Sequence, residues 1–510
     1  MKLKNLQISN FRCFESLSID LDEQLTVLVA ENGVGKTAIL DAIAVALGPF
    51  IGGFDTGVRK DFKYRDARIG IKNGPHLSIK FSDDEYRPQG SASKRMESKY
   101  PISLVASGMV EGQFETWSRE LTGEKTQTTF GKAKNIIDYA KKLQQQVRAD
   151  EQVSLPIVAY YGTGRLWRQS QASKRTSAQS DSRLYGYHDA LNPDSTYKAF
   201  EKWFTDKSLV EYHHIFIKHS NNLKEILNNI DKTKADNLKE ILNNADKNRF
   251  EYTDVSNNIK KNPIDSEDRN RSDETASYST ELDHVRKAIN RCISISGWKT
   301  LEYDLEWREL VVRFNHGRPG FDTFIPAAQL SDGVKAMLSL TADIAYRCVQ
   351  LNPHLASPTE ETTGIVLIDE IDLHLHPKWQ QTVLSDLRKA FLKIQFIVTT
   401  HSPQVISTVP SHQIRILDGN QVYSAEAGTK GAESSRILKR IFGVDPRPKD
   451  DPNTKKLNEY LDLVYADKWT DGEAKRKELD DIYQGNEPEL TKADLYIENR
   501  QWELEIEENQ

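Results

Sequence analysis

The sequence is poor in cysteine. Its three cysteines, Cys13, Cys292 and Cys348, are scattered over 510 residues without paired spacing. This distribution argues against a disulfide framework and against a zinc site built on cysteine pairs. It is typical of a protein that works in a reducing compartment, so we expect a cytoplasmic location.

Long apolar runs are also missing. No stretch approaches the roughly 18 apolar residues that a membrane-spanning helix needs. The first residues, Met1–Leu6, lack the apolar core of a signal peptide. Hydrophobic residues make up 38% of the chain and charged residues 28%. We therefore expect no membrane partner, and a chain long enough to fold into two or more lobes.

An overall excess of positive charge is absent. The net charge is −6, and the segment Asp471–Gln510 alone holds 13 acidic and 5 basic residues. That segment therefore carries −8, which leaves about +2 for the rest of the chain. A general charge argument for nucleic-acid binding fails, and only a local basic surface could serve that purpose.

A glycine-containing turn between a buried strand and a helix carries the strongest functional signal. Residues Leu25–Ala30 predict the strand, and Ala38–Leu47 predict the helix. A turn at the start of a helix offers unpaired N–H groups and the positive end of the helix dipole to a phosphate. Lys36 is expected to reach the β- and γ-phosphates of a nucleotide, and the Thr37 hydroxyl to ligate Mg²⁺. The residues expected to bind nucleotide here are Asn32, Gly33, Val34, Gly35, Lys36, Thr37 and Ala38.

Two further apolar strands end in residues suited to phosphoryl transfer. The strand Gly364–Ile368 is followed by Asp369, expected to hold Mg²⁺, and by Glu370, expected to orient or deprotonate the attacking water. The strand Phe396–Thr400 is followed by His401, at the strand end where open α/β sheets bind ligands. A core histidine that donates to the backbone is the alternative for His401.

An arginine near the N-terminus is a further candidate. Arg12 follows the predicted strand Leu3–Ile8 and could reach a nucleotide phosphate. The alternative is a solvated arginine at a strand end.

Together these segments resemble the motifs of ABC-type ATPases. The loop ending at Thr37, the segment Leu330–Gly333, the Asp369-Glu370 pair, the Asp372 loop and His401 follow the order of Walker A, signature, Walker B, D-loop and switch histidine. Ala30 departs from the pattern, because Walker A usually opens with glycine. The resemblance implies an α/β fold: an ABC-type ATPase head with a mixed sheet, a P-loop helix and a helical lobe.

The same resemblance implies a head-to-head dimer. Two ATP molecules, each with Mg²⁺, would lie between the Walker A loop of one subunit and the signature residues of the other. Those signature residues are Ser331, Asp332 and Gly333. Lys36, Glu370 and His401 would be the catalytic residues, and Thr37 and Asp369 the metal ligands.

The spacing of the motifs indicates the branch of this group. Thr37 and Leu330 stand 293 residues apart, far more than in a transporter cassette. With Asn10-Phe11-Arg12 after the first strand, the chain resembles the RecF/SMC/OLD group, whose arginine at this place approaches the nucleotide. The segments Tyr160–Arg165 and Ser434–Pro448 are similar to PtuA, the ATPase of Septu-type and retron-associated anti-phage systems. That similarity implies a homodimer or a higher homo-oligomer, a PtuB-like HNH nuclease as partner, and a reverse transcriptase with its RNA/DNA product as a further candidate partner.

The predicted organisation has four parts. The ATPase head comprises residues 1–194 and 281–425. Between them lies a helical, polar insertion at 195–280, in which Asn222–Asn229 recurs as Asn237–Asn244. Residues 426–510 are expected to form a helical, acidic extension. Its apolar residues either dock a partner or fold back on the chain's own core.

Three hypotheses for the function remain open at this point. The first is an ATP-binding, slowly hydrolysing switch that controls a separate nuclease during phage defence. The second is a RecF/SMC-like DNA-repair ATPase that engages DNA itself. The third is a binding module that has lost hydrolysis. The sequence contains no HNH spacing and no Toprim-like acidic cluster, so any nuclease must be a separate chain.

Overall fold

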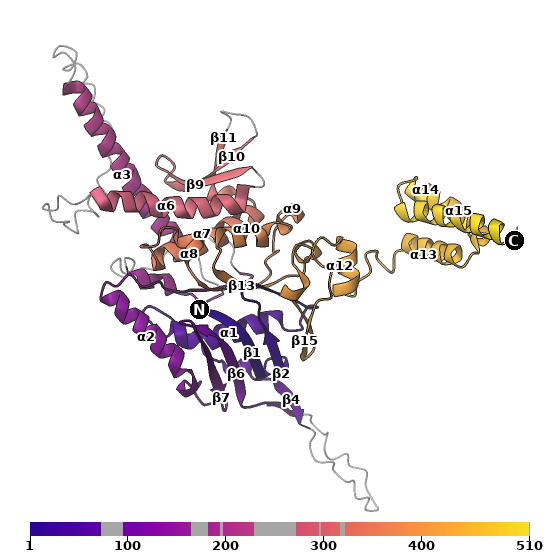
Figure 1. Ribbon diagram of the computed structural model, residues 1–510, viewed down its shortest axis with the longest axis horizontal. Helices are drawn as coiled ribbons and strands as arrows, with labels where there is room; N and C mark the ends of the chain where they lie inside the picture. Colours follow the sequence, from indigo (N-terminus) through magenta and orange to yellow (C-terminus); the bar gives the residue numbers. More distant parts are fainter. Residues whose placement is uncertain are drawn as a thin grey trace, which may run out of the picture. The chain divides into compact units, whose positions relative to one another are not determined.

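The computed structural model describes residues 1–72, 95–164, 182–193, 197–228, 272–294, 297–316 and 322–508. The described chain divides into two compact units, Met1–Gly431 and Ala432–Gln510, shown as ribbons in Figure 1. The second copy of the repeat, at 237–244, and Arg165 lie outside these residues. The insertion at 195–280 stays a prediction, since 229–271 also lies outside. No helix among the described residues combines the length and apolarity needed to span a membrane.

A mixed sheet forms the centre of the unit Met1–Gly431. Among the described residues it has six strands, in the order β15-β14-β3-β13-β12-β8, and all neighbours are parallel except β14 and β15. Every residue of β3, β8, β12 and β13 is buried, as expected for parallel strands covered on both faces. The strands are β3 (Leu25–Val29), β8 (Ile157–Tyr161), β12 (Gly364–Ile368), β13 (Ile394–Thr399), β14 (Ile414–Asp418) and β15 (Gln421–Ser424).

The phosphate-loop helix α1 (Lys36–Ile51) lies between this sheet and a second, antiparallel one. It contacts β13 on one side and β1, β6 and β7 on the other, and all its residues except Thr37 are buried. The helix was predicted to stop at Leu47, but it continues through Pro49, and the amide of Gly52 donates to the Gly48 carbonyl over 2.8 Å. In the described chain the antiparallel sheet has the order β2-β1-β6-β7, formed by β1 (Lys2–Phe11), β2 (Phe14–Asp20), β6 (Ile102–Val110) and β7 (Gln113–Leu121).

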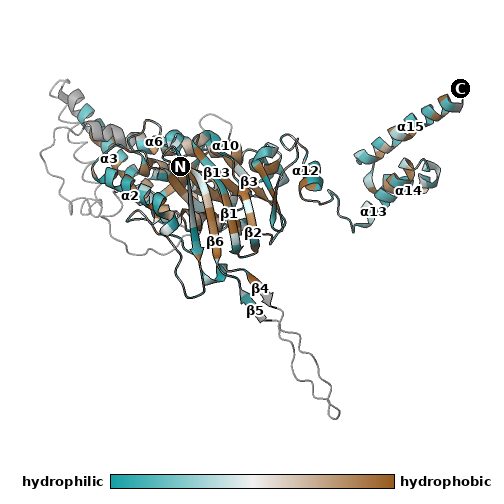
Figure 2. Ribbon diagram, turned by 60° about the horizontal axis from the view of Figure 1, so that its bottom comes forward, coloured by the Kyte–Doolittle hydropathy of each residue, from teal (hydrophilic) through white to brown (hydrophobic). Residues whose placement is uncertain are grey.

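Helices cover the other face of the central sheet. The helix α7 (Asp332–Leu351) contacts β8, and α6 (Ser272–Ile293) packs on α7 and on α10 (Val383–Ala390). Helix α3 (Lys198–Asn228) is joined to α6 by Arg286, whose guanidinium donates to both carboxylate oxygens of Glu211 over 3.0 and 2.8 Å. This arrangement confirms the predicted fold class of a mixed sheet with a phosphate-loop helix and a helical lobe. Figure 2 shows the hydrophobic residues concentrated on the strands.

The remaining elements of this unit are short or peripheral. A small antiparallel sheet, in the order β11-β10-β9, packs beside α6. The bounds are β4 (Ile69–Lys72), β5 (Arg95–Ser98), α2 (Lys134–Arg148), η4 (Arg183–Tyr187), β9 (Trp298–Asp304), β10 (Glu309–Asn315), β11 (Asp322–Pro326), α8 (Pro358–Glu361), α9 (Pro377–Gln380) and α11 (Pro403–Ile406).

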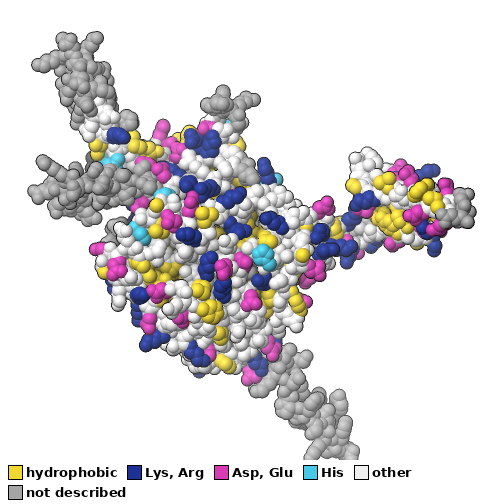
Figure 3. Space-filling model, viewed as in Figure 1, with side chains coloured by type: hydrophobic (Ala, Val, Ile, Leu, Met, Phe, Trp, Pro, Cys, Tyr) yellow, Lys and Arg dark blue, Asp and Glu magenta, His cyan; other side chains and the backbone are white. Residues whose placement is uncertain are grey.

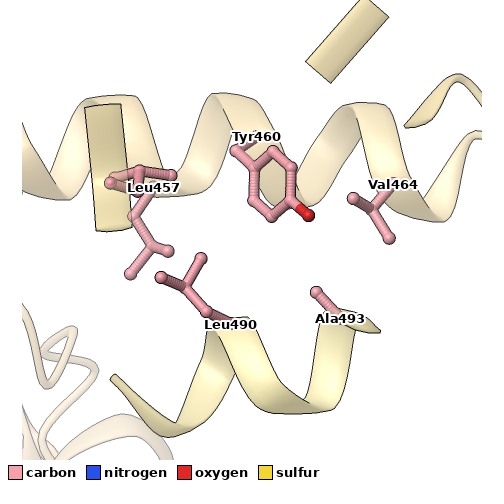
Figure 4. Packing of buried hydrophobic residues seen from close by; sticks show 6 residues of the cluster. Leu457, Tyr460, Val464, Leu490 and Ala493 are labelled. Atoms are coloured by element: carbon pink, nitrogen blue, oxygen red, sulfur yellow. The ribbon is translucent and has the colours of Figure 1, made fainter. Parts of the chain in front are cut away.

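The unit Ala432–Gln510 is helical and has a hydrophobic core of its own. It comprises α12 (Ser434–Ile441), α13 (Pro452–Tyr465), α14 (Trp469–Tyr483) and α15 (Pro488–Glu508). Figure 4 shows Leu457, Tyr460 and Val464 of α13 facing Leu490 and Ala493 of α15. Part of the apolar surface predicted for this extension is therefore buried within the unit. Leu495 and Trp502 do not belong to this core, because they are 54% and 65% exposed.

Replacing Leu457 by alanine is expected to destabilise this unit by about 2–5 kcal/mol, the usual range for a buried leucine truncated in a core. Leu457 is fully buried at the centre of the helical cluster. Hydrogen exchange of the amides in α13–α15, measured in the full chain, should become faster. Leu495→Ala is the matched control, because it removes the same atoms from an exposed site on α15. Equal acceleration in both variants would contradict the core assignment.

Candidate active site

The predicted phosphate loop joins β3 to α1. Gly33 and Gly35 have φ values of 81° and 115°, in the region that favours glycine. A Cβ on Gly35 would lie 2.5 Å from Cys13 Sγ and 2.5 Å from Phe14 Cζ, so both the backbone angle and the space require glycine. The loop therefore has the conformation of a turn whose amides can surround an anion at the N-terminus of α1.

Lys36 is held by its own loop. Its ammonium donates to the carbonyl of Ala30 over 2.9 Å and to that of Glu31 over 3.1 Å. Burial lowers the pKa of Lys36, and the carboxylates of Asp369, Glu370 and Asp372 oppose that shift. The ammonium thus lies within the field of the predicted catalytic carboxylates.

Asp369 and Thr37 meet although they are far apart in the sequence. The Thr37 hydroxyl donates to Asp369 Oδ2 over 2.8 Å, and the Thr399 hydroxyl donates to Asp369 Oδ1 over 2.7 Å. The amide of Asp369 donates to the carbonyl of Tyr161 over 2.8 Å, which continues the pairing of β12 with β8. A hydroxyl and a carboxylate are hard oxygen ligands, and Mg²⁺ commonly takes only one or two from protein. The donor set therefore fits Mg²⁺.

Glu370 occupies a strained turn at the end of β12. Its φ is 47°, which is uncommon for a residue with a side chain. Its amide donates to the Thr399 hydroxyl over 2.7 Å, and the neighbouring Thr400 hydroxyl donates to Asp372 Oδ1 over 2.5 Å. Two threonines at the end of β13 thus hold the turn that carries the predicted base and the D-loop aspartate.

His401 lies at the edge of the sheet, directly after these threonines. It is half-buried, so it is not a histidine of the core. Burial and the ammonium of Lys36 lower the pKa of His401, against the opposing carboxylates of Asp372, Glu370 and Asp369. This shift favours the neutral imidazole over its protonated form. A neutral ring can donate one hydrogen bond and accept another at the site.

Arg12 is neither free in solvent nor isolated. Its Nη1 donates to Asp41 Oδ2 over 2.6 Å, and its Nε donates to Asp66 Oδ1 over 2.9 Å. Burial alone would lower the pKa of Arg12, but these two carboxylates outweigh it and raise the pKa. Lys60 also donates to Asp41, over 2.6 Å. The alternative of a solvated arginine is therefore wrong, and its role toward nucleotide stays a prediction.

Sequence reasoning missed the carboxylates around Arg12. Asp41 lies one turn after Thr37, in a part of helix α1 whose other residues are all apolar, and only 9% of it is exposed. A lone carboxylate in an apolar helix was a signal that could have drawn attention, because buried charges need partners. Asp66 and Lys60 carried no comparable signal.

The signature segment opens α7. Ser331 occupies the N-cap position with extended backbone angles, and Ser331 and Asp332 are exposed. Gly333 packs against the D-loop, where a Cβ would lie 2.5 Å from the carbonyl oxygen of His374. No hydrogen bond recorded for the described residues joins the Ser331 side chain to the phosphate loop of its own chain. The serine is thus presented outward at a helix N-terminus, a position that favours anions.

Fold and site together define an ABC-type ATPase. The phosphate loop precedes α1, and the hydrogen bond between Thr37 and Asp369 joins this loop to the end of β12, an arrangement that agrees with this class. The chain belongs to the AAA ATPase domain family, whose model matches residues 1–406.

Curated proteins support this assignment along the chain. The Retron Ec83 probable ATPase of Escherichia coli is 29% identical over 540 aligned residues, which cover 100% of this chain and 89% of that protein. The Retron Vc95 probable ATPase of Vibrio cholerae is 26% identical and covers 82% of this chain and 74% of its own. Septu protein PtuA of Bacillus mycoides is 42% identical over 27% of this chain and 18% of its own. The predicted similarity to PtuA and to retron ATPases is confirmed, and the chain is an ATPase.

Proposed function

We propose that this ATPase is the nucleotide-driven switch of an anti-phage defence system, in which two copies enclose ATP and Mg²⁺ and control a partner nuclease. The observation that carries this proposal is the division of the site. The phosphate loop, Asp369 and Glu370 are assembled within one chain, whereas Ser331 is exposed and makes no recorded hydrogen bond to them. A second copy can supply the missing serine.

Within one site the residues have distinct roles. Lys36 and the loop amides bind the phosphates, and Arg12 approaches the nucleotide after exchanging one of its carboxylate partners. Thr37 and Asp369 would hold Mg²⁺, which neutralises phosphate charge when it is bound. Glu370 orients or deprotonates the attacking water, and neutral His401 positions it by a hydrogen bond. Hydrolysis is slow and serves to reset the switch.

The proposed partners follow from the relatives. Two of them carry the word retron in their names and one is a Septu PtuA. We therefore propose a PtuB-like HNH nuclease as the partner, with a reverse transcriptase and its RNA/DNA product as further components, in the cytoplasm. Three free cysteines suit that reducing compartment. The alternative, a DNA-repair ATPase that grips DNA directly, gains no support from Figure 3, in which Lys and Arg are interspersed with Asp and Glu on the visible face.

Mixing two inactive variants tests whether the site is shared between copies. Lys36→Ala removes the phosphate-binding lysine and Ser331→Arg blocks the signature, so each variant alone should hydrolyse almost no ATP. In a mixed pair, the intact phosphate loop of one copy meets the intact signature of the other. Random pairing should therefore restore at most about one quarter of the wild-type rate, since half the pairs are mixed and each has one working site out of two.

A second mixture provides the control. Lys36→Ala combined with Glu370→Gln leaves every site with a defect, so no rate should return. Pull-down with two different tags confirms that mixed pairs form. If mixed pairs of Lys36→Ala and Ser331→Arg form but stay inactive, the proposal of a shared site is overturned.

A further inference from the structure

A buried polar network joins the signature helix to the central sheet. The Tyr161 hydroxyl donates to Asp343 Oδ2 over 2.7 Å, and Arg347 Nε donates to the same oxygen over 2.7 Å. Arg347 Nη1 also donates to the carbonyls of Gly186 and His188 over 2.8 and 3.1 Å. Tyr161 is 3% exposed, Asp343 3% and Arg347 5%. The charged groups of Asp343 and Arg347 are thus shielded from solvent, and each has a further hydrogen-bond partner besides the other.

General stability does not account for such a network. A buried ion pair gains little over apolar side chains of the same volume, because both charges lose their hydration. What it does impose is a single arrangement of the groups that it joins, since any other arrangement leaves a buried charge unpaired. Burial raises the pKa of Tyr161 well above its usual value, so the hydroxyl keeps the proton that it donates to Asp343.

Tyr161 is bound to both halves of the proposed site. Its hydroxyl reaches Asp343 on α7, the helix that starts at Ser331. Its backbone carbonyl accepts the amide of Asp369, the proposed metal ligand, over 2.8 Å. Ser331 lies twelve residues before Asp343, about 18 Å along a helix that rises 1.5 Å per residue. Through its side chain and its backbone, one residue therefore ties the middle of the signature helix to the proposed metal ligand.

A second tie prevents α7 from pivoting about this point. Asn352, the C-cap of α7, accepts from the amide of Leu155 over 2.7 Å and donates to the Leu155 carbonyl over 2.9 Å. Leu155 lies just before β8, and Tyr161 is the last residue of β8. Helix α7 is thus fastened to both ends of the same strand. A displacement at Ser331 has to be transmitted to β8 rather than absorbed by a loose contact.

We propose that Tyr161, Asp343 and Arg347 are positioning residues that couple the signature helix to Asp369 and Glu370 of the same chain. When Ser331 closes on the nucleotide of a second copy, α7 moves as one body and carries β8 with it. The metal ligand and the base of its own site are then brought into their working positions. The coupling rests on the proposed shared site, and it makes hydrolysis at one site depend on occupancy of the other. In the mixed pairs of Lys36→Ala and Ser331→Arg the second site cannot close, so the restored rate should lie about five- to tenfold below one quarter of the wild-type rate.

Tyr161→Phe tests the coupling, because it removes only the hydroxyl and keeps the ring and the Asp343–Arg347 pair. ATP binding and KM should stay within twofold of the wild type, since the phosphate loop is untouched. The kcat is expected to fall about five- to tenfold, the range of one lost hydrogen bond. The dependence of the rate on ATP concentration should also lose its cooperativity.

Tyr212→Phe is the matched control. Tyr212 of α3 is half-buried, and its hydroxyl donates to the carbonyl of Tyr303 on β9 over 2.9 Å, outside the network of Tyr161, Asp343 and Arg347. Both variants lose one hydrogen bond of a tyrosine hydroxyl, so a loss of thermal stability alone should appear in both. Only Tyr161→Phe should lower kcat while leaving KM unchanged.

Two outcomes would overturn the coupling. One is an equal change of kcat in Tyr161→Phe and Tyr212→Phe. If Tyr161→Phe fails to fold, Asp343→Asn replaces it in the test, because this change keeps the shape of the side chain. Unchanged kcat and unchanged cooperativity in Asp343→Asn would then overturn the coupling. If the mixed variants of the previous section restore hydrolysis and either outcome is found, the coupling fails but the shared site stands. If the mixture stays inactive, the shared site itself fails.

Discussion

Replacing Glu370 by glutamine is expected to slow ATP hydrolysis by about 10²–10⁴-fold, the usual contribution of a general base. The backbone of Glu370 is held by the Thr399 hydroxyl at a φ of 47°, so an isosteric amide should take the same place. The amide cannot accept a proton from water. ATP should therefore stay bound, and ATP-containing pairs should accumulate. Phosphate release measures the rate, and size-exclusion chromatography with ATP measures the pairing.

Glu23→Gln is the control for this substitution. Glu23 is exposed and pairs with Lys4 on the surface, so the same change of carboxylate to amide should leave the rate unaltered. Unaltered turnover in Glu370→Gln, with nucleotide binding still dependent on Lys36, would show that Glu370 is not the base. The hypothesis of a chain that binds ATP without hydrolysing it is tested by the same assay on the wild type.

Replacing Lys36 by alanine is expected to weaken ATP binding by about ten- to a hundredfold, the range for hydrogen bonds to a charged group. In the free protein the ammonium is satisfied by the carbonyls of Ala30 and Glu31. These neutral acceptors can be exchanged for phosphate oxygens, which form stronger, charge-assisted bonds. Titration calorimetry with ATP and Mg²⁺ measures the loss, in a variant that also carries Glu370→Gln to prevent turnover.

Lys142→Ala controls for the loss of one positive charge. Lys142 is exposed on α2 and pairs with Glu111, so its removal should leave the affinity unchanged. Equal affinities for Lys36→Ala and the wild type would contradict the assignment of the phosphate loop. A change in Lys142→Ala of the same size would instead show that overall charge governs binding.

Much of the site could be predicted because its parts are local patterns. The runs at 25–30, 364–368 and 396–400 are rich in apolar residues and predict buried strands, and the polar residues after each run are then expected at one edge of a parallel sheet. The structure agrees: Thr37 and Asp369, 332 residues apart, are joined by a hydrogen bond of 2.8 Å. The signature was predicted only from the resemblance of Leu330–Gly333 to the ABC-type motif, at the start of a long apolar helix.

Other parts could not be predicted, since they depend on contacts between distant segments. Nothing near Arg12 in the sequence announces that Asp41 and Asp66 hold it, because the three meet only after α1 and the loop before β4 have packed. The helices of the C-terminal unit showed apolar faces. Their pattern did not say that Leu457 and Tyr460 would face Leu490, while Trp502 would stay exposed.

The sequence by itself determined the candidate residues of the site: a phosphate loop, a carboxylate proposed to bind metal, a proposed base and a proposed signature serine, each defined by neighbours within a few residues. Backbone angles, helix dipoles and strand burial act over that range, so a linear pattern suffices. Only the tertiary structure decided how these parts are connected, through Tyr161, Asp343 and Arg347 and through the carboxylates around Arg12. Such ties join charges that become neighbours when water is excluded between folded segments, and no local pattern records which charges those will be.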